Sequence, residues 1–220
     1  FEYSVWFLII YFPLLFEHFI VPNYHDFDTQ PLELMWFIKK IIEASIPGFL
    51  FFVSVNYLLL HAWMNAWAEM LRFADRLFYK DWWNFTSYRA YYRTWNVVVH
   101  DWLYTYVYKD MYEILVPRNR SLAAFTVFFV SAVFHEYIFV FMFNFFYPVM
   151  LFLFGVNIIF VLCDVNVSNI FIWLSFCIGN GILVSMYAIE YYARYYCAPY
   201  SNYYINLFQP RSWNCQRQLA

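Results

Sequence analysis

Long stretches without a charged residue dominate the chain. Four of them cover residues 3–16, 44–68, 137–163 and 165–189. A helix that crosses a membrane needs about 20 mostly apolar residues in a row. Together with the apolar residues beside each stretch, this pattern predicts five membrane spans, at about residues 1–21, 46–69, 121–143, 147–163 and 169–191.

Composition favours helical spans over a membrane β-barrel. Hydrophobic residues make up 64% of the 220 residues and charged residues 13%, about half the charged share of a typical soluble domain. The chain has only four glycines, and its apolar stretches lack the alternation of barrel strands. We therefore expect an all-α, polytopic transmembrane helical bundle that forms a single membrane domain over residues 1–220. The chain begins in an apolar stretch and without Met, so we expect further spans upstream.

The segment between the second and third predicted spans is different. Residues 70–120 contain eight of the thirteen Lys and Arg residues and many Trp and Tyr side chains. Basic loops stay on the cytosolic side of a membrane, and Trp and Tyr prefer its interface. We expect two or three partly embedded helices on the cytosolic face here. Alternation of sides then places a loop over residues 22–45, a turn near residues 144–147 and a tail over residues 192–220 in the lumen, and it places residues 164–168 in the cytosol.

Two of the four cysteines, Cys197 and Cys215, lie in this tail. A lumenal tail is in an oxidising compartment, where the two could form a disulfide; two free thiols are the alternative. The other two, Cys163 and Cys177, lie in or beside predicted spans, where small buried apolar residues are common. Because no His lies near the tail cysteines, we expect no metal site.

The third predicted span contains ionisable residues at membrane depth. His135 and Glu136 lie inside it, and Ser131 precedes His135 by about one helical turn. Ionisable groups in a membrane usually face a cavity or a partner, and a histidine can act as a general base near neutral pH. A hydrogen-bonded packing histidine beside a Glu that extends toward the membrane interface explains the pattern equally well.

Two aromatic motifs lie in the basic segment. Residues 78–84 read FYKDWWN, and this mixture of Trp, Tyr and Lys is also typical of an anchor at the membrane interface. In residues 91–104, which read YYRTWNVVVHDWLY, Asn96 and His100 are four positions apart and would share one face of a helix. Such a pair can bind the polar head of a substrate, or it can form an ordinary interhelical hydrogen bond.

These motifs resemble one branch of the membrane-bound O-acyltransferase superfamily, whose members esterify sterols and diacylglycerol. Residues 78–84 are similar to the FYxDWWN signature of this branch, and residues 131–137 (SAVFHEY) are similar to the helix with its catalytic histidine. Residues 91–104 and residues 210–215 (PRSWNC) resemble the sterol enzymes in particular. The similarity extends from about His61 to the end of the chain.

The resemblance implies roles for individual residues. His135 matches the catalytic histidine, and Asn96 matches a second active-site residue. Further residues match positions near the acyl-CoA and sterol substrates: Phe78, Tyr79, Asp81, Trp82, Trp83, Asn84, Tyr92, Arg93, Trp95, His100, Tyr108 and Ser131. Cys197 and Cys215 match the spacing of a tail cysteine pair. The family fold is a bundle of nine spans, of which this chain would contain about five.

The resemblance also implies a reaction: transfer of a long-chain fatty acyl group from acyl-CoA to the 3-hydroxyl of cholesterol or a related sterol, in a membrane-embedded tunnel. His135 would remove the hydroxyl proton, and Asn96 would stabilise the oxyanion or orient the substrate. Acyl-CoA is then a co-substrate, and no cofactor is expected.

The expected setting is the endoplasmic-reticulum membrane, where the protein would cross the bilayer several times, contact lipid and form a homodimer or homotetramer. A net charge of −2 gives no indication of a nucleic-acid partner. Two alternatives stay open at this point: a diacylglycerol O-acyltransferase of the same superfamily, and a non-enzymatic membrane channel or transporter.

Overall fold

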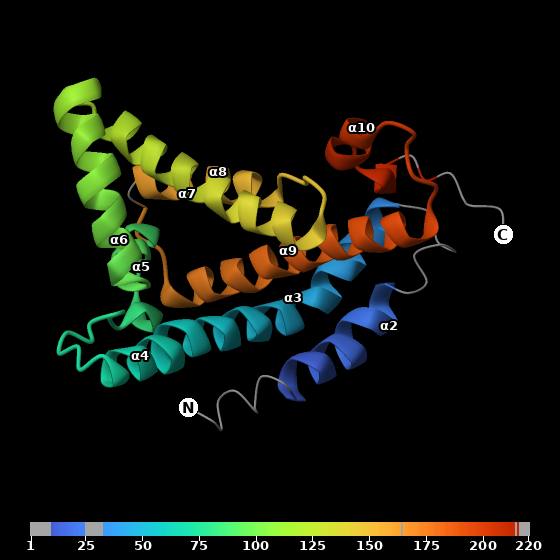
Figure 1. The fold of residues 1–220 in the computed structure, drawn as a ribbon, viewed down its shortest axis with the longest axis horizontal. Coiled ribbons are helices and arrows are strands. Elements are labelled where there is room, and N and C mark those ends of the chain that lie inside the picture. The colour runs from blue at the N-terminus through green and yellow to red at the C-terminus, as the bar shows by residue number, and fades with distance from the viewer. Residues whose placement is uncertain (1–9, 25–32, 164, 214, 216–220) are drawn as a thin grey trace. The chain divides into compact units, whose positions relative to one another are not determined.

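The computed structural model describes residues 10–24, 33–163, 165–213 and 215, which form helices joined by loops (Figure 1). The long helices are α3 (Leu34–Asn56), α7 (Arg120–Phe143), α8 (Val149–Cys163) and α9 (Asn169–Tyr196). The shorter ones are α2 (Val21–Tyr24), α4 (Met64–Met70), α5 (Tyr88–Thr94), α6 (Val97–Leu103) and α10 (Tyr203–Phe208). Among the described residues there are also π-helical and 3-10 turns: η1 (Phe16–Ile20), η3 (Tyr57–Trp63), η4 (Trp82–Asn84), η5 (Tyr104–Tyr108), η6 (Met111–Leu115) and η7 (Arg211–Trp213). No strand occurs among these residues, as the all-α prediction requires.

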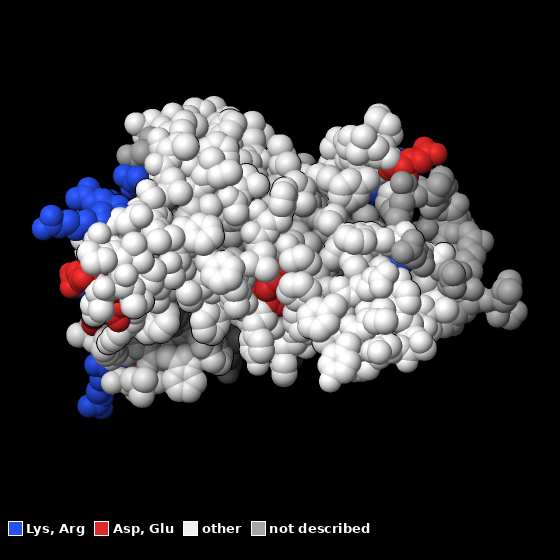
Figure 2. Space-filling model, turned by 90° about the horizontal axis from the view of Figure 1, so that it is seen from above, with Lys and Arg blue, Asp and Glu red and all other residues white. Residues whose placement is uncertain are grey.

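Three helices in the described part of the chain are long and apolar enough to cross a membrane: Leu34–Met70, Arg120–Phe143 and Asn169–Tyr196. The apolar helix α8 has 15 residues, which at 1.5 Å per residue gives about 22 Å, less than the ~30 Å hydrocarbon core. On the face drawn in Figure 2, uncharged side chains cover most of the surface and charged ones occupy small patches. The chain is therefore a multi-pass membrane protein. Residues 10–24 of the first predicted span and its flank are helical, and residues 1–9 lie outside the described part.

The second span begins earlier than predicted. We expected a loop over residues 22–45, but α3 begins at Leu34 and continues through η3 and α4 as one helix of 37 residues. The charges that suggested a loop instead pair along the helix: the Glu43 carboxylate lies 3.7 Å from Lys39 Nζ and 3.1 Å from Lys40 Nζ. Opposite charges three or four positions apart stabilise a helix. The loop prediction is therefore wrong from Leu34 onward and also at residues 22–24, which belong to α2, whereas residues 25–32 lie outside the described part of the chain.

The ends of the later helices follow local backbone chemistry. After α7, Asn144 adopts the left-handed conformation with φ of 59° and donates its N–H to the Val140 carbonyl oxygen at 2.8 Å. Asn tolerates this conformation better than most residues and is a common residue just after a helix. The predicted turn at residues 144–147 is thus present. By contrast, α9 continues to Tyr196, so the tail begins at residue 197 and not at residue 192.

Contacts divide the chain into two compact units. Of the described residues, the first contains Ser54–Phe134 and Met150–Ser175, and the second contains those within Val5–Val53, His135–Val149 and Phe176–Ala220. The helices α3, α7 and α9 each contribute residues to both units. The division therefore does not follow a linker between separate domains.

In the second unit, α3 and α9 approach each other closely. A Cβ atom on Gly181 of α9 would overlap Ser45 Oγ and lie 2.6 Å from the Ile41 carbonyl oxygen of α3. A Cβ atom on Gly48 of α3 would lie 3.0 Å from the Asn180 carbonyl oxygen of α9. Small residues allow helix backbones to touch in this way, and they are common where membrane helices associate.

Candidate active site

Residues 78–84 form an ordered segment beside the junction of α5 and α6. The Lys80 N–H donates to the Thr94 carbonyl oxygen at 2.8 Å. The Val97 N–H donates to the Phe78 carbonyl oxygen at 3.0 Å. These backbone hydrogen bonds attach the segment to the last residue of α5 and to the first residue of α6.

A cluster of aromatic rings packs around this segment. The Trp82 ring lies 4.6 Å from the Trp95 ring, edge to face, and 5.7 Å from the Trp173 ring of α9. Phe85 and Tyr91 are buried, with ring centroids 5.1 Å apart. Burial raises the pKa of Tyr91 well above its usual value, so its hydroxyl stays neutral. Aromatic pairs of this kind add about 0.5–1.5 kcal/mol each to the effect of burial. The structure thus brings Trp82 and Trp95, both predicted site residues, together.

Asn96 caps α6 and does not lie within it. Its backbone is extended, with φ of −138° and ψ of 92°, and its side-chain oxygen accepts a hydrogen bond from the Val99 N–H at 3.1 Å. The prediction that Asn96 and His100 share a face of one helix is therefore wrong, because α6 begins only at Val97. Since Oδ1 is bound to the helix, the side chain offers its NH2 group as the donor for any further partner.

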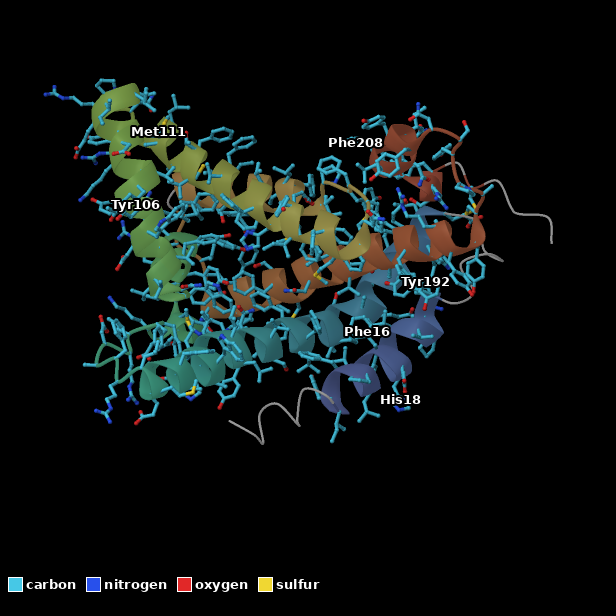
Figure 3. The ribbon with its side chains drawn as sticks, viewed as in Figure 1. Phe16, His18, Tyr106, Met111, Tyr192 and Phe208 are labelled. Atoms are coloured by element: carbon cyan, nitrogen blue, oxygen red, sulfur yellow. A yellow bond between two sulfur atoms is a disulfide. The ribbon has the colours of Figure 1, made fainter. Side chains whose placement is uncertain are left out.

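His100 and Tyr108 belong to a row of aromatic side chains that begins in α6. His100 Nδ1 lies 3.0 Å from Asp101 Oδ1, and the His100 ring is nearly parallel to the Tyr104 ring. The rings of Tyr104, Tyr108 and Tyr112 continue the row, with successive centroids 5.5 and 5.9 Å apart. Tyr106, labelled in Figure 3, lies outside this row and is 63% exposed.

The other predicted site residues of the first unit differ in exposure. Tyr92 packs edge to face against Phe128 of α7 at 4.8 Å, and burial raises the pKa of the Tyr92 hydroxyl. Ser131 of α7 is half-buried. Four predicted site residues are exposed: Asp81, Trp83, Asn84 and Arg93.

A pocket of about 370 Å³ lies along η3 and α4, and its lining includes Tyr57, His61, Asn65 and Arg76. His61 Nδ1 lies 2.8 Å from the Tyr79 hydroxyl, and the His61 ring stacks on Tyr57 with centroids 5.0 Å apart. π-Helical turns are rare and often occur at functional sites. The sequence assigned His61 no role, and a histidine inside an apolar helix is the one signal that could have pointed to it.

The first residue of α9 and the residues just before it contact the chain at the end of the segment 78–84 and just after it. Asn169 Nδ2 donates to the carbonyl oxygens of Trp83 and Phe85, at 3.0 Å each. The Val167 N–H donates to the Thr86 carbonyl oxygen at 2.9 Å. Sequence reasoning missed these contacts, because polar residues before an apolar run predict where a helix starts but not what its side chains bind.

His135 and Glu136 have opposite surroundings on α7. His135 is exposed, whereas Glu136 is only 3% exposed. The Tyr187 hydroxyl of α9 lies 3.0 Å from Glu136 Oε1 and 2.9 Å from the Tyr147 carbonyl oxygen. Glu136 is therefore a buried partner of α9 and not a side chain that extends toward the membrane interface. His135 belongs to the second unit, and Asn96 belongs to the first.

A buried carboxylate attaches the tail to α9. Glu190 is fully buried, and its Oε1 accepts from Arg194 Nε at 2.7 Å and from the Arg211 N–H at 2.9 Å. Its Oε2 accepts from the Ser212 N–H at 3.1 Å and from Ser212 Oγ at 2.7 Å. Four hydrogen bonds thus compensate for the burial of this charge.

A disulfide joins Cys197 and Cys215, whose Cα atoms are 5.3 Å apart. Between them, the ring of Phe208, labelled in Figure 3, packs against Phe146 at 5.6 Å. The Phe146 N–H also donates to the Leu207 carbonyl oxygen at 2.9 Å. The tail is therefore attached by a disulfide, by ring packing and by the buried carboxylate.

Comparison with known proteins shows what the chain is similar to. The membrane-bound O-acyltransferase family matches residues 1–189. Sterol O-acyltransferase 2 from Homo sapiens is 44% identical over 213 residues, which cover 94% of this chain and 41% of that protein. Sterol O-acyltransferase 1 from Chlorocebus aethiops is 42% identical over 216 residues, which cover 96% of this chain and 39% of that protein. Sterol O-acyltransferase 1 from Mus musculus is 40% identical over 214 residues, which cover 94% of this chain and 40% of that protein.

The chain spans about two fifths of the length of these relatives. The family match extends over most of the 220 residues. The chain therefore belongs to the membrane-bound O-acyltransferase family.

Proposed function

We propose that the protein containing this chain transfers a long-chain fatty acyl group from acyl-CoA to the 3-hydroxyl of cholesterol or a related sterol. The observation that carries this proposal is the similarity to proteins named sterol O-acyltransferase 1 and 2, at 40–44% identity over at least 94% of the chain. The aligned part is long enough to include both aromatic motifs and the helix with His135.

In the proposed reaction, the sterol hydroxyl oxygen attacks the carbonyl carbon of the thioester. His135 takes the hydroxyl proton as the new C–O bond forms, because an alcohol is a poor nucleophile without a base. Negative charge develops on the carbonyl oxygen, and the C–S bond breaks when this charge returns to the carbonyl. The thiolate of CoA leaves and receives the proton from His135. The products are a steryl ester and CoA, and the histidine is neutral again without the help of a metal or redox cofactor.

Asn96 is the proposed donor to the carbonyl oxygen in this reaction. Its Oδ1 is bound to the Val99 N–H at 3.1 Å, which fixes the amide plane and leaves the NH2 group to donate. A donor that is already oriented stabilises the developing charge without reorganisation, and its loss typically costs about 10²–10³-fold in kcat.

The proposed setting is the endoplasmic-reticulum membrane, with the protein present as a homo-oligomer. Diacylglycerol is the competing acceptor within the family, and the names of the similar proteins favour a sterol. Family membership also favours an enzyme over a channel or transporter.

The test is an acceptor comparison with the natural protein in membranes from cells that lack their own esterifying activity. Wild-type protein supplied with a long-chain acyl-CoA should form steryl ester from cholesterol and little triacylglycerol from diacylglycerol. The variant His135→Ala should lose about 10²–10⁴-fold in turnover. The matched control is His18→Ala, since His18 is also an exposed histidine of the second unit. Triacylglycerol as the main product would reassign the acceptor, and wild-type turnover in His135→Ala would remove His135 from the chemistry.

A further inference from the structure

We infer that Asn169 is a positioning residue for the acyl transfer: its side-chain amide fixes residues 78–84 and, through them, the backbone that carries Asn96. This inference rests on the proposed function, and all of the contacts that support it lie within the first unit.

The amide group of Asn169 donates both of its N–H bonds at the C-terminal end of this segment, one to Trp83 within it and one to Phe85 directly after it. Nδ2 lies 3.0 Å from the Trp83 carbonyl oxygen and 3.0 Å from the Phe85 carbonyl oxygen. An amide NH2 group has two hydrogens, so two acceptors use its full donor capacity. The two carbonyls lie at the end of the 3-10 turn η4, where carbonyl groups lack partners within the turn. The side chain of Asn169 therefore caps this turn from another helix.

Two further contacts attach the same place to α9 and the residues before it. The Val167 N–H donates to the Thr86 carbonyl oxygen at 2.9 Å. The Trp173 ring, one helical turn after Asn169, lies 5.7 Å from the Trp82 ring and 6.4 Å from the Phe85 ring. The carbonyl groups of Trp83, Phe85 and Thr86 and the rings of Trp82 and Phe85 thus all contact residues 167–173.

The opposite edge of the segment meets the residues around Asn96. The Phe78 carbonyl oxygen accepts from the Val97 N–H, the residue directly after Asn96, and Lys80 bonds to Thr94, two residues before it. A displacement of the segment therefore displaces the junction on which Asn96 lies. Misplacing a reacting group by about 1 Å can cost 10²-fold in rate.

Asn169 is not needed to start α9. Ser168 caps this helix, because its Oγ accepts a hydrogen bond from the Phe171 N–H at 3.2 Å. A carboxylate in the first turn of a helix is favourable. The variant Asn169→Asp therefore has nearly the same shape and suits the start of the helix, but it has no N–H to donate and turns an acceptor oxygen toward two carbonyl oxygens. The variant Asn169→Asp therefore removes the hydrogen bonds that Asn169 donates to Trp83 and Phe85 without weakening the start of α9.

The experiment compares wild type, Asn169→Asp and Ser168→Ala in the natural protein in membranes. We expect Asn169→Asp to lower kcat by about 10- to 100-fold with little change in either KM, since positioning acts on the reacting geometry. Ser168→Ala should keep near wild-type kcat, although it loses a helix cap worth about 1 kcal/mol. Hydrogen exchange of the backbone amides of residues 82–86 should become faster in Asn169→Asp and stay unchanged in Ser168→Ala.

Three results would overturn the inference: wild-type kcat in Asn169→Asp, unchanged exchange at residues 82–86 in that variant, or an equal loss of kcat in Ser168→Ala. If Asn169→Asp does not fold, Asn169→Ser keeps one donor, and its kcat should lie clearly below that of wild type. If wild type forms no steryl ester, the proposed function fails by itself, and the exchange measurement still decides whether Asn169 fixes the segment.

Discussion

Gly181 is the position where the structure predicts the sharpest response to a single methyl group. The substitution Gly181→Ala adds a Cβ atom that overlaps Ser45 Oγ and lies 2.6 Å from the Ile41 carbonyl oxygen and 3.0 Å from Ser45 Cα. The last two are backbone atoms of α3, so no side-chain rotation removes the overlap. The two helices must therefore move apart, or α9 must rotate.

Two opposing effects set the size of the change. Ala is better than Gly in a helix interior by about 1 kcal/mol. Forcing extra volume into a packed contact costs about 1–3 kcal/mol, and the cost here is near the upper end because backbone atoms must move. We therefore expect a net loss of about 2 kcal/mol for Gly181→Ala.

The assay is thermal unfolding of the purified protein in detergent, with Gly179→Ala as the control. Gly179 lies in the same helix, but a Cβ atom there would have no neighbour within 4 Å. Gly179→Ala should therefore keep or raise Tm, whereas Gly181→Ala should lower Tm by several degrees. The double variant with Ser45→Ala should recover only part of the loss, because the Ile41 carbonyl remains.

Two results would refute this reasoning. If Gly181→Ala is as stable as Gly179→Ala, then α3 and α9 do not approach each other as the structure has them. If Ser45→Ala restores full stability, then the Ser45 hydroxyl and not the backbone of α3 limits the approach.

Three further predictions concern the chemistry, the sidedness and the tail. Asn96→Ala should lower kcat by about 10²–10³-fold with little change in the KM for acyl-CoA, because an oxyanion donor acts in the transition state; steady-state kinetics that show a change in KM alone would make Asn96 a substrate-binding residue. The three sequons at Asn84, Asn119 and Asn166 should carry no glycan, because all lie on the side predicted to be cytosolic; a glycosidase-sensitive shift in mass would reverse the orientation. Cys197→Ser should lower the free energy of unfolding by up to about 3 kcal/mol and leave most turnover intact, as the buried carboxylate of α9 still holds the tail; loss of all turnover in a folded variant would link the tail to catalysis.

The sequence predicts α7 and α9 well, because their apolar character is local. The predicted span at residues 121–143 matches α7 (Arg120–Phe143) within one residue at its start, and α9 (Asn169–Tyr196) begins where predicted. The start of α3 was missed because Lys39, Lys40 and Glu43 interrupt the apolar pattern as single residues, whereas in the helix they lie close enough to pair.

The candidate site is harder to predict from the sequence than the helices, because its contacts join residues that are far apart along the chain. The motif resemblance located residues 78–84 and Asn96, but not the cap that Asn96 forms on α6. The contact from Asn169 to Trp83 spans 86 positions along the chain. No local pattern of polar and apolar residues predicts such a contact. It can be identified only from the structure, in which the start of α9 packs against η4.

The hydrogen bond between Val167 and Thr86 also limits how the chain can be threaded through a bilayer. Two residues joined at 2.9 Å lie on the same side of a membrane, so the chain between them crosses it an even number of times. If α7 crosses once, the return crossing belongs to α8, the apolar helix just before Val167. At about 22 Å for 15 residues, α8 is some 8 Å shorter than the hydrocarbon core. A span that is too short is accommodated by thinning of the bilayer, by flanking side chains that reach to the interface or by oligomerisation, each at a modest cost per ångström, so a crossing by α8 requires one of these next to the loop that leads to Asn169.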